Sequence, residues 1–456
     1  MPDLLTSTLN HGPTMTGQRT EALALTSTPD LIFDPVFEQD PQSIVAIFRH
    51  ASGFTVFSAL EDGDGASASY SVKYTDVTSV PLHFNFLVIS SCPRHLQATE
   101  SHKLHVVVST KSGFCLATRC WNQVVKPLLT WAQRLAGNTQ TQGYSLLVTE
   151  NAESIKGFSA EVLGAGKPGQ TILLMSGDGG TVDLINAITP DDRQTPQTTI
   201  AILPLGTGNA LFHSIHRPLY GNGPESALIH GLRTLIHGAP KRLPLFRADF
   251  SPGARIVTFV QSQNNMTSLP VNSLHGAIVA SHGFHASIVY ESDTPEYRKH
   301  GDKRFSMVAN ELLELNHTYK AVVKVRRPNG KGLETLPGHE FNYILSTLVS
   351  SLEKTFTISP HSQPCDGKLR VVSFAPLGKE RVLEVMMAAY DNGAHVSMPE
   401  VSYQEVEELR VSVNEANDRW RKFCIDGTIV AVPEGGWMSV KTIQTSPFQV
   451  VAPSSM

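Results

Sequence analysis

The 456-residue sequence predicts an open α/β domain followed by a mostly antiparallel β-sandwich domain, with a β-rich segment before them. Between residues 104 and 204, four apolar strand-length runs alternate with helix-length segments. Two of these runs lead directly into glycine-rich loops. Beyond about residue 241, strand-length runs are separated by Gly, Pro and Asn turns and lose the alternation with helices.

The N-terminal part of the chain divides into two segments. Residues 1–40 are rich in Thr, Ser and Pro and show no apolar period, so we predict a disordered lead. From Ile44 onward, short alternating runs are separated by turns such as EDGDGAS. This pattern predicts a β-rich segment over residues 41–100.

Residues 101–238 are predicted to form the α/β domain. Each of its strand runs is apolar throughout, which is typical of parallel strands covered by helices on both faces. The predicted strands are LHVVVS, YSLLVTE, TILLMS and TIAILP, and the segments between them are WNQVVKPLLTWAQRLA, AESIKGFSAEVLG and TVDLINAI.

Residues 239–456 are predicted to form the antiparallel sandwich domain. Nine strand-length runs, from RLPLFRADF to WMSVKTIQ, are punctuated by turn residues. Two helices are expected to interrupt them, one around Pro295–Leu315 and one around Lys379–Tyr390.

The composition excludes several classes of protein. Lys and Arg number 37 against 41 Asp and Glu, a net charge of −4, so we expect no nucleic-acid partner. No apolar run approaches the roughly 18 residues of a membrane helix. The five cysteines form no C-x-x-C pair and are odd in number, so we expect free thiols, no zinc and a cytoplasmic location.

Two glycine loops are the strongest functional signal. One reads Ser176-Gly-Asp-Gly-Gly-Thr181 and the other Pro204-Leu-Gly-Thr-Gly-Asn209, and each joins a strand to a helix. Free N–H groups at such a helix start favour an anion, and glycine lets backbone approach phosphate closely. Asp178 would repel phosphate unless it binds Mg²⁺ or takes a proton, which suits phosphoryl transfer. Either loop alone also fits an ordinary turn.

Another loop, Ser109-Thr-Lys-Ser-Gly113, also lies between a predicted strand and helix and precedes these two in the chain, so the first loop is 109–113, the second 176–181 and the third 204–209. The first loop has a single glycine and is weaker evidence for a phosphate site. It matches neither G-x-G-x-x-G nor the P-loop pattern, so these two nucleotide-binding readings are excluded.

The motifs M-S-G-D-G-G and P-L-G-T-G-N-A-L resemble those of the diacylglycerol kinase catalytic-domain superfamily, and within it the sphingosine and ceramide kinase branch. The resemblance continues in order through Gly283-Phe284, the Tyr297–Phe305 segment and Cys424-Ile-Asp-Gly427. It implies an ATP-binding α/β domain, a lipid-binding β-sandwich domain, and an active site in the cleft between them.

The resemblance also implies roles for individual residues, with ATP and Mg²⁺ as cofactors. Asp178 corresponds to the general base toward a lipid hydroxyl, and Asp426 to a Mg²⁺ or catalytic candidate. The family pattern names no other metal ligand in this sequence. The residues that correspond to nucleotide contacts are Ser112, Gly113, Gly177, Gly179, Gly206, Thr207, Gly208, Asn209, Arg298 and Arg304.

The sequence departs from the family pattern at three places. The first loop lacks the second glycine of N-P-x-x-G-x-G and has Cys115 there, and Thr428 replaces the acid of the D-G-E signature. After Gly283-Phe284 the chain reads His285-Ala-Ser-Ile-Val289, with no carboxylate to pair with a sphingoid amine. Diacylglycerol, ceramide or another neutral-headed lipid is therefore an open alternative to a sphingoid base.

We expect an ATP- and Mg²⁺-dependent lipid kinase that phosphorylates a hydroxyl of a sphingoid base or diacylglycerol. The altered first loop leaves a lipid-binding or regulatory protein with a degenerate site and little turnover as an alternative. A kinase of soluble substrates on the same scaffold is another. A lipid substrate lies at a bilayer, so the expected partners are that lipid and, transiently, a membrane surface.

Overall fold

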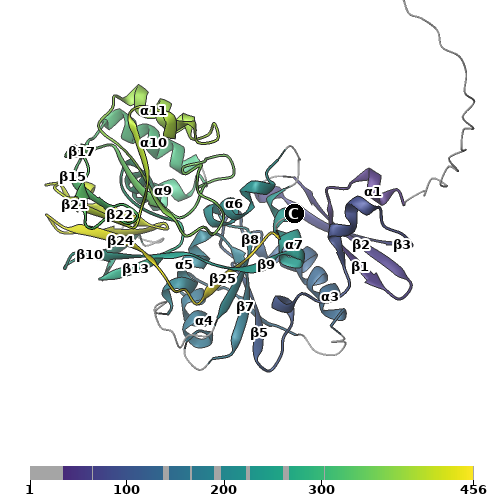
Figure 1. Ribbon diagram of the computed structural model, residues 1–456. Coiled ribbons are helices and arrows are strands. Elements are labelled where there is room, and N and C mark those ends of the chain that lie inside the picture. Colours follow the sequence, from purple (N-terminus) through teal and green to yellow (C-terminus); the bar gives the residue numbers. More distant parts are fainter. Residues whose placement is uncertain are drawn as a thin grey trace, which may run out of the picture.

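The computed structural model describes residues 34–63, 65–136, 143–164, 167–188, 197–221, 226–259, 266–301 and 303–454 (Figure 1). Residues 1–33 of the predicted lead lie outside this range. The end of that lead is ordered, because α1 (Val36–Gln39) buries Val36 and Phe37 in a small apolar cluster. The structured part of the chain therefore begins before residue 41.

The β-rich N-terminal segment forms a four-stranded sheet in the order β3-β2-β1-β4. The predicted strand HFNFLVIS is mostly a 3-10 turn (Leu82–Leu87) that follows Pro81 and leaves only a two-residue strand. The strands are β1 (Ile44–His50), β2 (Gly53–Asp62), β3 (Ser69–Val77) and β4 (Val88–Ile89), and further 3-10 turns are η1 (Gly65–Ser67) and η3 (Arg94–Leu96).

This sheet packs against helices of the α/β domain (Figure 1). The Phe48 ring stacks on Trp131 of α3 (Lys126–Arg134) with centroids 5.5 Å apart. On α7 (Ala227–His237), Arg233 donates from Nε to the carbonyl of Ile44 at 2.8 Å. One continuous apolar cluster joins the two parts, so the N-terminal sheet is an integral layer of the structure.

The α/β domain has a central sheet in the order β6-β5-β7-β8-β25-β9 (Figure 1). The first four are parallel, as predicted: β5 (His102–Val108), β6 (Ser145–Val148), β7 (Gly169–Ser176) and β8 (Thr198–Pro204). The last two come from the segment predicted as sandwich: β25 (Phe448–Ala452) lies parallel to β8, and β9 (Ala239–Arg242) lies antiparallel to β25. The other helices are α2 (Ala117–Cys120), a π-helical turn (Trp121–Val125), α4 (Ser154–Val162), α5 (Asp178–Asn186), α6 (Ala210–His216) and the 3-10 turn η5 (Arg217–Leu219).

The second domain contains two antiparallel sheets that share one core. Phe246 and Val323 of one sheet belong to the same apolar cluster as Ile344 and Phe423 of the other. The first sheet has the order β13-β10-β24-β21-β15-β16, with β17 also paired to β15, and the second has the order β12-β11-β23-β22-β14-β18-β19-β20.

Helices lie in both predicted insertions, around residues 295–315 and 379–390, and a further helix at Phe284–Ser292 was not predicted. The helices are α8 (Phe284–Ser292), α9 (Pro295–Arg298), α10 (Lys303–Leu315) and α11 (Lys379–Ala388), with 3-10 turns η6 (Ala394–Ser397) and η7 (Asp418–Trp420). The strands are β10 (Leu245–Phe250), β11 (Arg255–Phe259), β12 (Met266–Pro270), β13 (Ser273–Gly276), β14 (Val279–Gly283), β15 (Tyr319–Arg326), β16 (Glu334–Thr335), β17 (Glu340–Phe341), β18 (Tyr343–Thr347), β19 (Leu369–Phe374), β20 (Val401–Val406), β21 (Glu408–Val413), β22 (Lys422–Ile425), β23 (Thr428–Ala431) and β24 (Trp437–Ile443).

The two domains are in direct contact. One apolar cluster contains Ile172 and Leu211 of the α/β domain together with Ala277 and Val349 of the second domain. Ser214 of α6 donates to the carbonyl of Ser351 at 2.9 Å and accepts from the Ser351 amide at 3.0 Å. Across the described ranges, no helix combines the length and apolar character needed to cross a bilayer.

We predict that Phe48→Ala destabilises the whole protein, because the ring is fully buried against α3 and its loss leaves a cavity. The expected cost is about 3–5 kcal/mol in the free energy of unfolding. Leu82→Ala, at a side chain that is 85% exposed, should change it by less than about 0.5 kcal/mol. Denaturant unfolding followed by circular dichroism measures both; an equal effect of the two substitutions would contradict the docked sheet.

Candidate functional site

The two glycine loops meet backbone to backbone at the carboxyl ends of β7 and β8. A Cβ atom on Gly206 would stand 2.2 Å from the Cα of Gly177, and one on Gly177 would stand 2.5 Å from the carbonyl oxygen of Gly208. The Asp178 amide also donates to that carbonyl at 3.0 Å. Glycine is thus required at both positions by contact between the loops themselves.

Asp178 bridges the two loops through its side chain. Its carboxylate accepts from the amide of Ala210 at 2.7 Å and from that of Leu211 at 3.1 Å, so it caps the start of α6. Asp178 is itself the first residue of α5, which begins earlier than the predicted TVDLINAI helix. Burial raises the pKa of this carboxyl to about 6, against the lowering effect of the two amides.

The remaining residues of the third loop, Thr207 to Asn209, are held by a local hydrogen-bond pair. The Asn209 side chain accepts from the Gly206 amide at 3.2 Å and donates to the Gly206 carbonyl at 2.8 Å. Gly208 lies beside Asp178, since a Cβ there would be 3.3 Å from Oδ2. Thr207 lies on the loop between Gly206 and Gly208, which are both held in place.

The first loop packs against the other two despite its single glycine. Gly113 has a φ of +52°, and a Cβ there would stand 2.6 Å from the Leu205 carbonyl oxygen. The Ser112 hydroxyl lies 3.1 Å from that of Ser176 at the end of β7. Cys115, which replaces the family's second glycine, adopts a positive φ of 62° and is exposed. Cys115 therefore has a backbone conformation that favours glycine.

Asp426 lies on the second domain in the two-residue turn between β22 and β23. Asp426 and Gly427 both have positive φ, as a tight hairpin turn requires. The Asp426 carboxylate accepts from the amides of Ala277 and Val279, each at 2.6 Å, and from that of Ile278 at 3.1 Å. It therefore fixes the segment that joins β13 to β14.

Asp178 and Asp426 lie within electrostatic range of each other across the domain interface. Burial raises the pKa of Asp426 to about 7, and repulsion from Asp178 contributes to that rise while amide hydrogen bonds oppose it. Asn186 at the other end of α5 helps to fix this approach, because its side chain exchanges two 2.9 Å hydrogen bonds with the His275 backbone. The site thus has one carboxylate from each domain.

Two carboxylates suit Mg²⁺ only in company with other oxygen ligands. No group of three or more His, Cys, Asp or Glu side chains within the described ranges could hold a metal ion. Mg²⁺ is typically bound by one or two carboxylates together with substrate phosphates and water. Asp178 and Asp426 fit that pattern.

Arg298 and Arg304 converge on one acid rather than on the glycine loops. Arg298 makes two hydrogen bonds to Asp293, at 2.9 and 2.6 Å, and Arg304 Nη1 lies 3.6 Å from the same carboxylate. Among the residues that the structure describes, the Arg304 Nε is buried without a hydrogen-bond partner. Within the same ranges, no hydrogen bond or ion pair links either arginine to the loops around Asp178.

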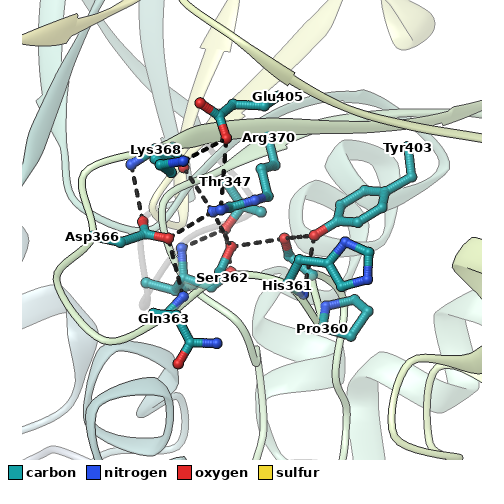
Figure 2. Close-up of polar contacts among 12 residues, drawn as sticks. Thr347, Pro360, His361, Ser362, Gln363, Asp366, Lys368, Arg370, Tyr403 and Glu405 are labelled. Atoms are coloured by element: carbon teal, nitrogen blue, oxygen red, sulfur yellow. Dashed lines mark hydrogen bonds and ion pairs between the residues drawn. The ribbon is translucent and has the colours of Figure 1, made fainter.

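A polar cluster outside these motifs orders the loop at residues 359–370 (Figure 2). Arg370 is buried and donates to Ser362 at 3.0 Å and to Asp366 at 2.9 Å. Ser359 lies 2.8 Å from the Tyr403 hydroxyl. Because these side chains hold one another, the cluster explains the loop's shape, and we assign it no chemistry.

Several functional groups of the site could not be read from sequence motifs. The amides of Ala210, Leu211 and Ala277 are backbone groups, whose direction depends on the fold. Thr149, after β6, accepts from the Thr110 amide at 3.0 Å and so braces the first loop. Its only sequence signal is its position at a strand's carboxyl end.

Residues 103–245 match the family model described as the diacylglycerol kinase catalytic domain. The resemblance noted from the glycine motifs is confirmed for this part of the chain. A catalytic domain of this family implies kinase activity in general, and kinases of the family use ATP. No curated protein matches the chain by sequence.

Solved structures from Bacillus anthracis strain Sterne share the fold. Two, each described as a candidate diacylglycerol kinase, align with TM-scores of 0.51 and 0.50 at 14% and 12% identity. A third, described as a diacylglycerol kinase, gives a TM-score of 0.45 at 12% identity. Each comparison covers 78% of this chain and 98% of the other, and at these identities the likeness concerns the fold alone.

We predict that Gly206→Ala separates the two loops, because its methyl group would overlap Gly177. Binding of a non-hydrolysable ATP analogue, measured by calorimetry, should weaken at least about tenfold. Gly157→Ala in α4 is the matched control, since a Cβ there also meets nothing within 4 Å and the residue lies outside the glycine loops. Equal binding by the Gly206 and Gly157 variants would show that the loop contact is not needed for the nucleotide.

Proposed function

We propose that the protein is an ATP- and Mg²⁺-dependent lipid kinase that transfers the γ-phosphate of ATP to a lipid hydroxyl. The observation that carries this proposal is Asp178, a partly buried carboxylate with a raised pKa, held between two close-packed glycine loops. The family match over residues 103–245 supports a kinase, and the second domain supplies the facing carboxylate, Asp426.

The glycine loops would receive the phosphates of ATP. Open space beside Gly179 lets phosphate oxygens approach the backbone there, whereas the amides of Asp178 and Gly206 already donate to the Gly208 carbonyl and the Asn209 side chain. Ser112 and Gly113 of the first loop border the same site.

Asp178 would accept the proton that leaves the lipid hydroxyl. A carboxylate with a pKa near 6 is largely ionised at neutral pH and is more basic than an ordinary aspartate. Its hydrogen bonds to α6 fix its orientation and leave further lone pairs on both oxygens for the substrate. The hydroxyl oxygen is thus activated where it meets the γ-phosphorus.

Positive charge would come from the metal and from the arginines. Mg²⁺, which Asp426 and the phosphates would hold, would supply charge neutralisation. Arg298 and Arg304 lie together on Asp293, and this shared acid holds two guanidinium groups side by side. We infer that they exchange part of this pairing for phosphate oxygens when ATP binds.

The surroundings of α8 favour a neutral lipid head group over a sphingoid amine. The Ser287 hydroxyl accepts from Tyr319 at 2.9 Å, and Ser281 lies 2.8 Å from His285 Nδ1. Burial lowers the pKa of His285 to about 4, so it is neutral at physiological pH.

The two nearest acids are already paired with arginines. Glu291 makes two 2.8 Å hydrogen bonds to Arg419, and Asp293 holds Arg298. Neither offers a free carboxylate to an ammonium group. We therefore place diacylglycerol and ceramide ahead of sphingosine as substrates, and transient contact with a membrane surface supplies them.

Incubation of the full-length protein with radiolabelled ATP, Mg²⁺ and mixed micelles of diacylglycerol, ceramide or sphingosine should yield labelled phospholipid, mainly from the neutral lipids. Asp178→Asn should lower the rate at least about a hundredfold, because it removes the base while keeping the size of the side chain. Asp391→Asn, at an exposed acid on the second domain, is the control and should retain full activity.

Three outcomes would count against parts of this proposal. ATP binding without any labelled product would favour a degenerate-site lipid-binding protein, and labelling of soluble alcohols alone would favour a soluble-substrate kinase. An unchanged rate in the Asp178 variant would remove Asp178 as the base.

Activity should fall in acid as Asp178 takes up a proton. Its pKa is raised from 3.8 to about 6, so the ionised, active form is lost about two pH units earlier than for an ordinary aspartate. We expect kcat/KM to drop about tenfold per pH unit below pH 6. Asp426→Asn should show the same fall in kcat/KM below pH 6, at a lower overall rate. If this fall disappears in that variant, it belongs to the titration of Asp426 and not of Asp178.

A further inference from the structure

A pocket of about 370 Å³ lies between the N-terminal sheet and the α/β domain, outside the catalytic residues described above. It borders the third glycine loop at Leu205 and Gly206, and includes neither Asp178 nor Asp426. Its other walls come from the β2–β3 hairpin, from Phe114 in the first loop, from the start of α7, and from Lys354 of the second domain. Its volume is that of a site for a small organic ligand.

The floor of the pocket is apolar and rigid. Ala68, Tyr70 and Leu228 line it, and each is less than 7% exposed. The Phe114 ring stands at its edge with 54% of its surface exposed, and a Cβ on Gly65 would lie 3.7 Å from that ring. Burial of a half-exposed aromatic ring by an apolar ligand is favourable, so the floor suits a hydrocarbon or aromatic body.

The charged groups around this floor favour an anion. Lys354, the basic residue of the lining, extends over the Tyr220 ring with its Nζ 5.3 Å from the ring centroid. Arg119 lies outside the lining and donates to the Ala68 carbonyl at 2.6 Å. The first turn of α7 adds the partial positive charge of a helix start beside Leu228. Glu61, on the exposed end of β2, is the acid among the lining residues.

We propose that this pocket binds a small amphiphilic anion, an apolar body bearing a phosphate or carboxylate, with the anionic group at Lys354 and the body on the Tyr70–Leu228 floor. The N-terminal sheet, which precedes the segment matched by the family model, thereby completes a ligand site of its own. A ligand in this pocket would contact the third glycine loop directly at Leu205 and Gly206. The proposal concerns binding and does not depend on the proposed lipid kinase activity.

The full-length protein can be tested with the aromatic anion 1-anilinonaphthalene-8-sulfonate as a fluorescent probe and with competitors below their micelle concentrations. Octyl phosphate and octanoate should displace the probe, and their relative affinities distinguish the two anionic groups. Octanol, which lacks the charge, and inorganic phosphate, which lacks the chain, should each require at least about tenfold higher concentration. Displacement by octanol as strong as by octyl phosphate would overturn the anionic part of the proposal.

Two variants locate the probe in this pocket. Lys354→Gln should weaken octyl phosphate about tenfold, as expected for loss of one charge-assisted hydrogen bond, and leave octanol unchanged. Lys331→Gln, at an exposed lysine of the same domain, is the matched control. Ala227→Leu should fill the pocket and weaken probe and competitors alike, with unchanged circular dichroism showing that the fold persists.

Competition with nucleotide separates this site from the catalytic one. ADP at saturating concentration should leave probe binding in place. Complete displacement by ADP would assign the pocket to the nucleotide and overturn the proposal, as would equal binding by the wild type and by the Lys354 and Ala227 variants.

Discussion

The contact between the backbones of Gly177 and Gly206 is the constraint on which the site depends. Because no side chain separates them, the carboxyl ends of β7 and β8 approach closely enough for Asp178 to reach across and cap α6. α6 in turn bonds to the second domain through Ser214 and Ser351. The close contact between these two glycines therefore aligns the glycine loops and orients the Asp178 carboxylate. Through α6 it also links the loops and the carboxylate to the domain that supplies Asp426.

The second domain repeats this arrangement in a different local structure. Asp426 occupies a tight hairpin turn, and its carboxylate gathers three successive amides between β13 and β14. In both domains an aspartate is buried against backbone N–H groups, which orient the carboxylate, while low solvation keeps its basicity high. In each domain, backbone amides orient the two oxygens of the aspartate carboxylate, and burial raises the basicity of those same oxygens.

The sequence predicted the parallel strands, the antiparallel character of the second domain and the glycine loops, because these features are local. Apolar runs, Asp-Gly turns and strand–loop–helix order can be read over a few residues. The path of the C-terminus could not be predicted, because β25 pairs with β8 across 250 residues of sequence and its apolar pattern suits either domain. The pairing of Arg298 and Arg304 with Asp293 likewise depends on how α8, α9 and α10 turn in space.

The return of β25 to the first sheet has a mechanical consequence. The chain passes between the domains twice, once after β9 and once between β24 and β25, and these strands are neighbours at the same edge (Figure 1). These two neighbouring chain connections act as a hinge. They permit rotation of one domain about the line through both connections, and they resist sliding or twisting of the domains against each other. Any opening of the interface between the domains would then move Asp426 along an arc relative to Asp178, so closure would return the two carboxylates to one relative position.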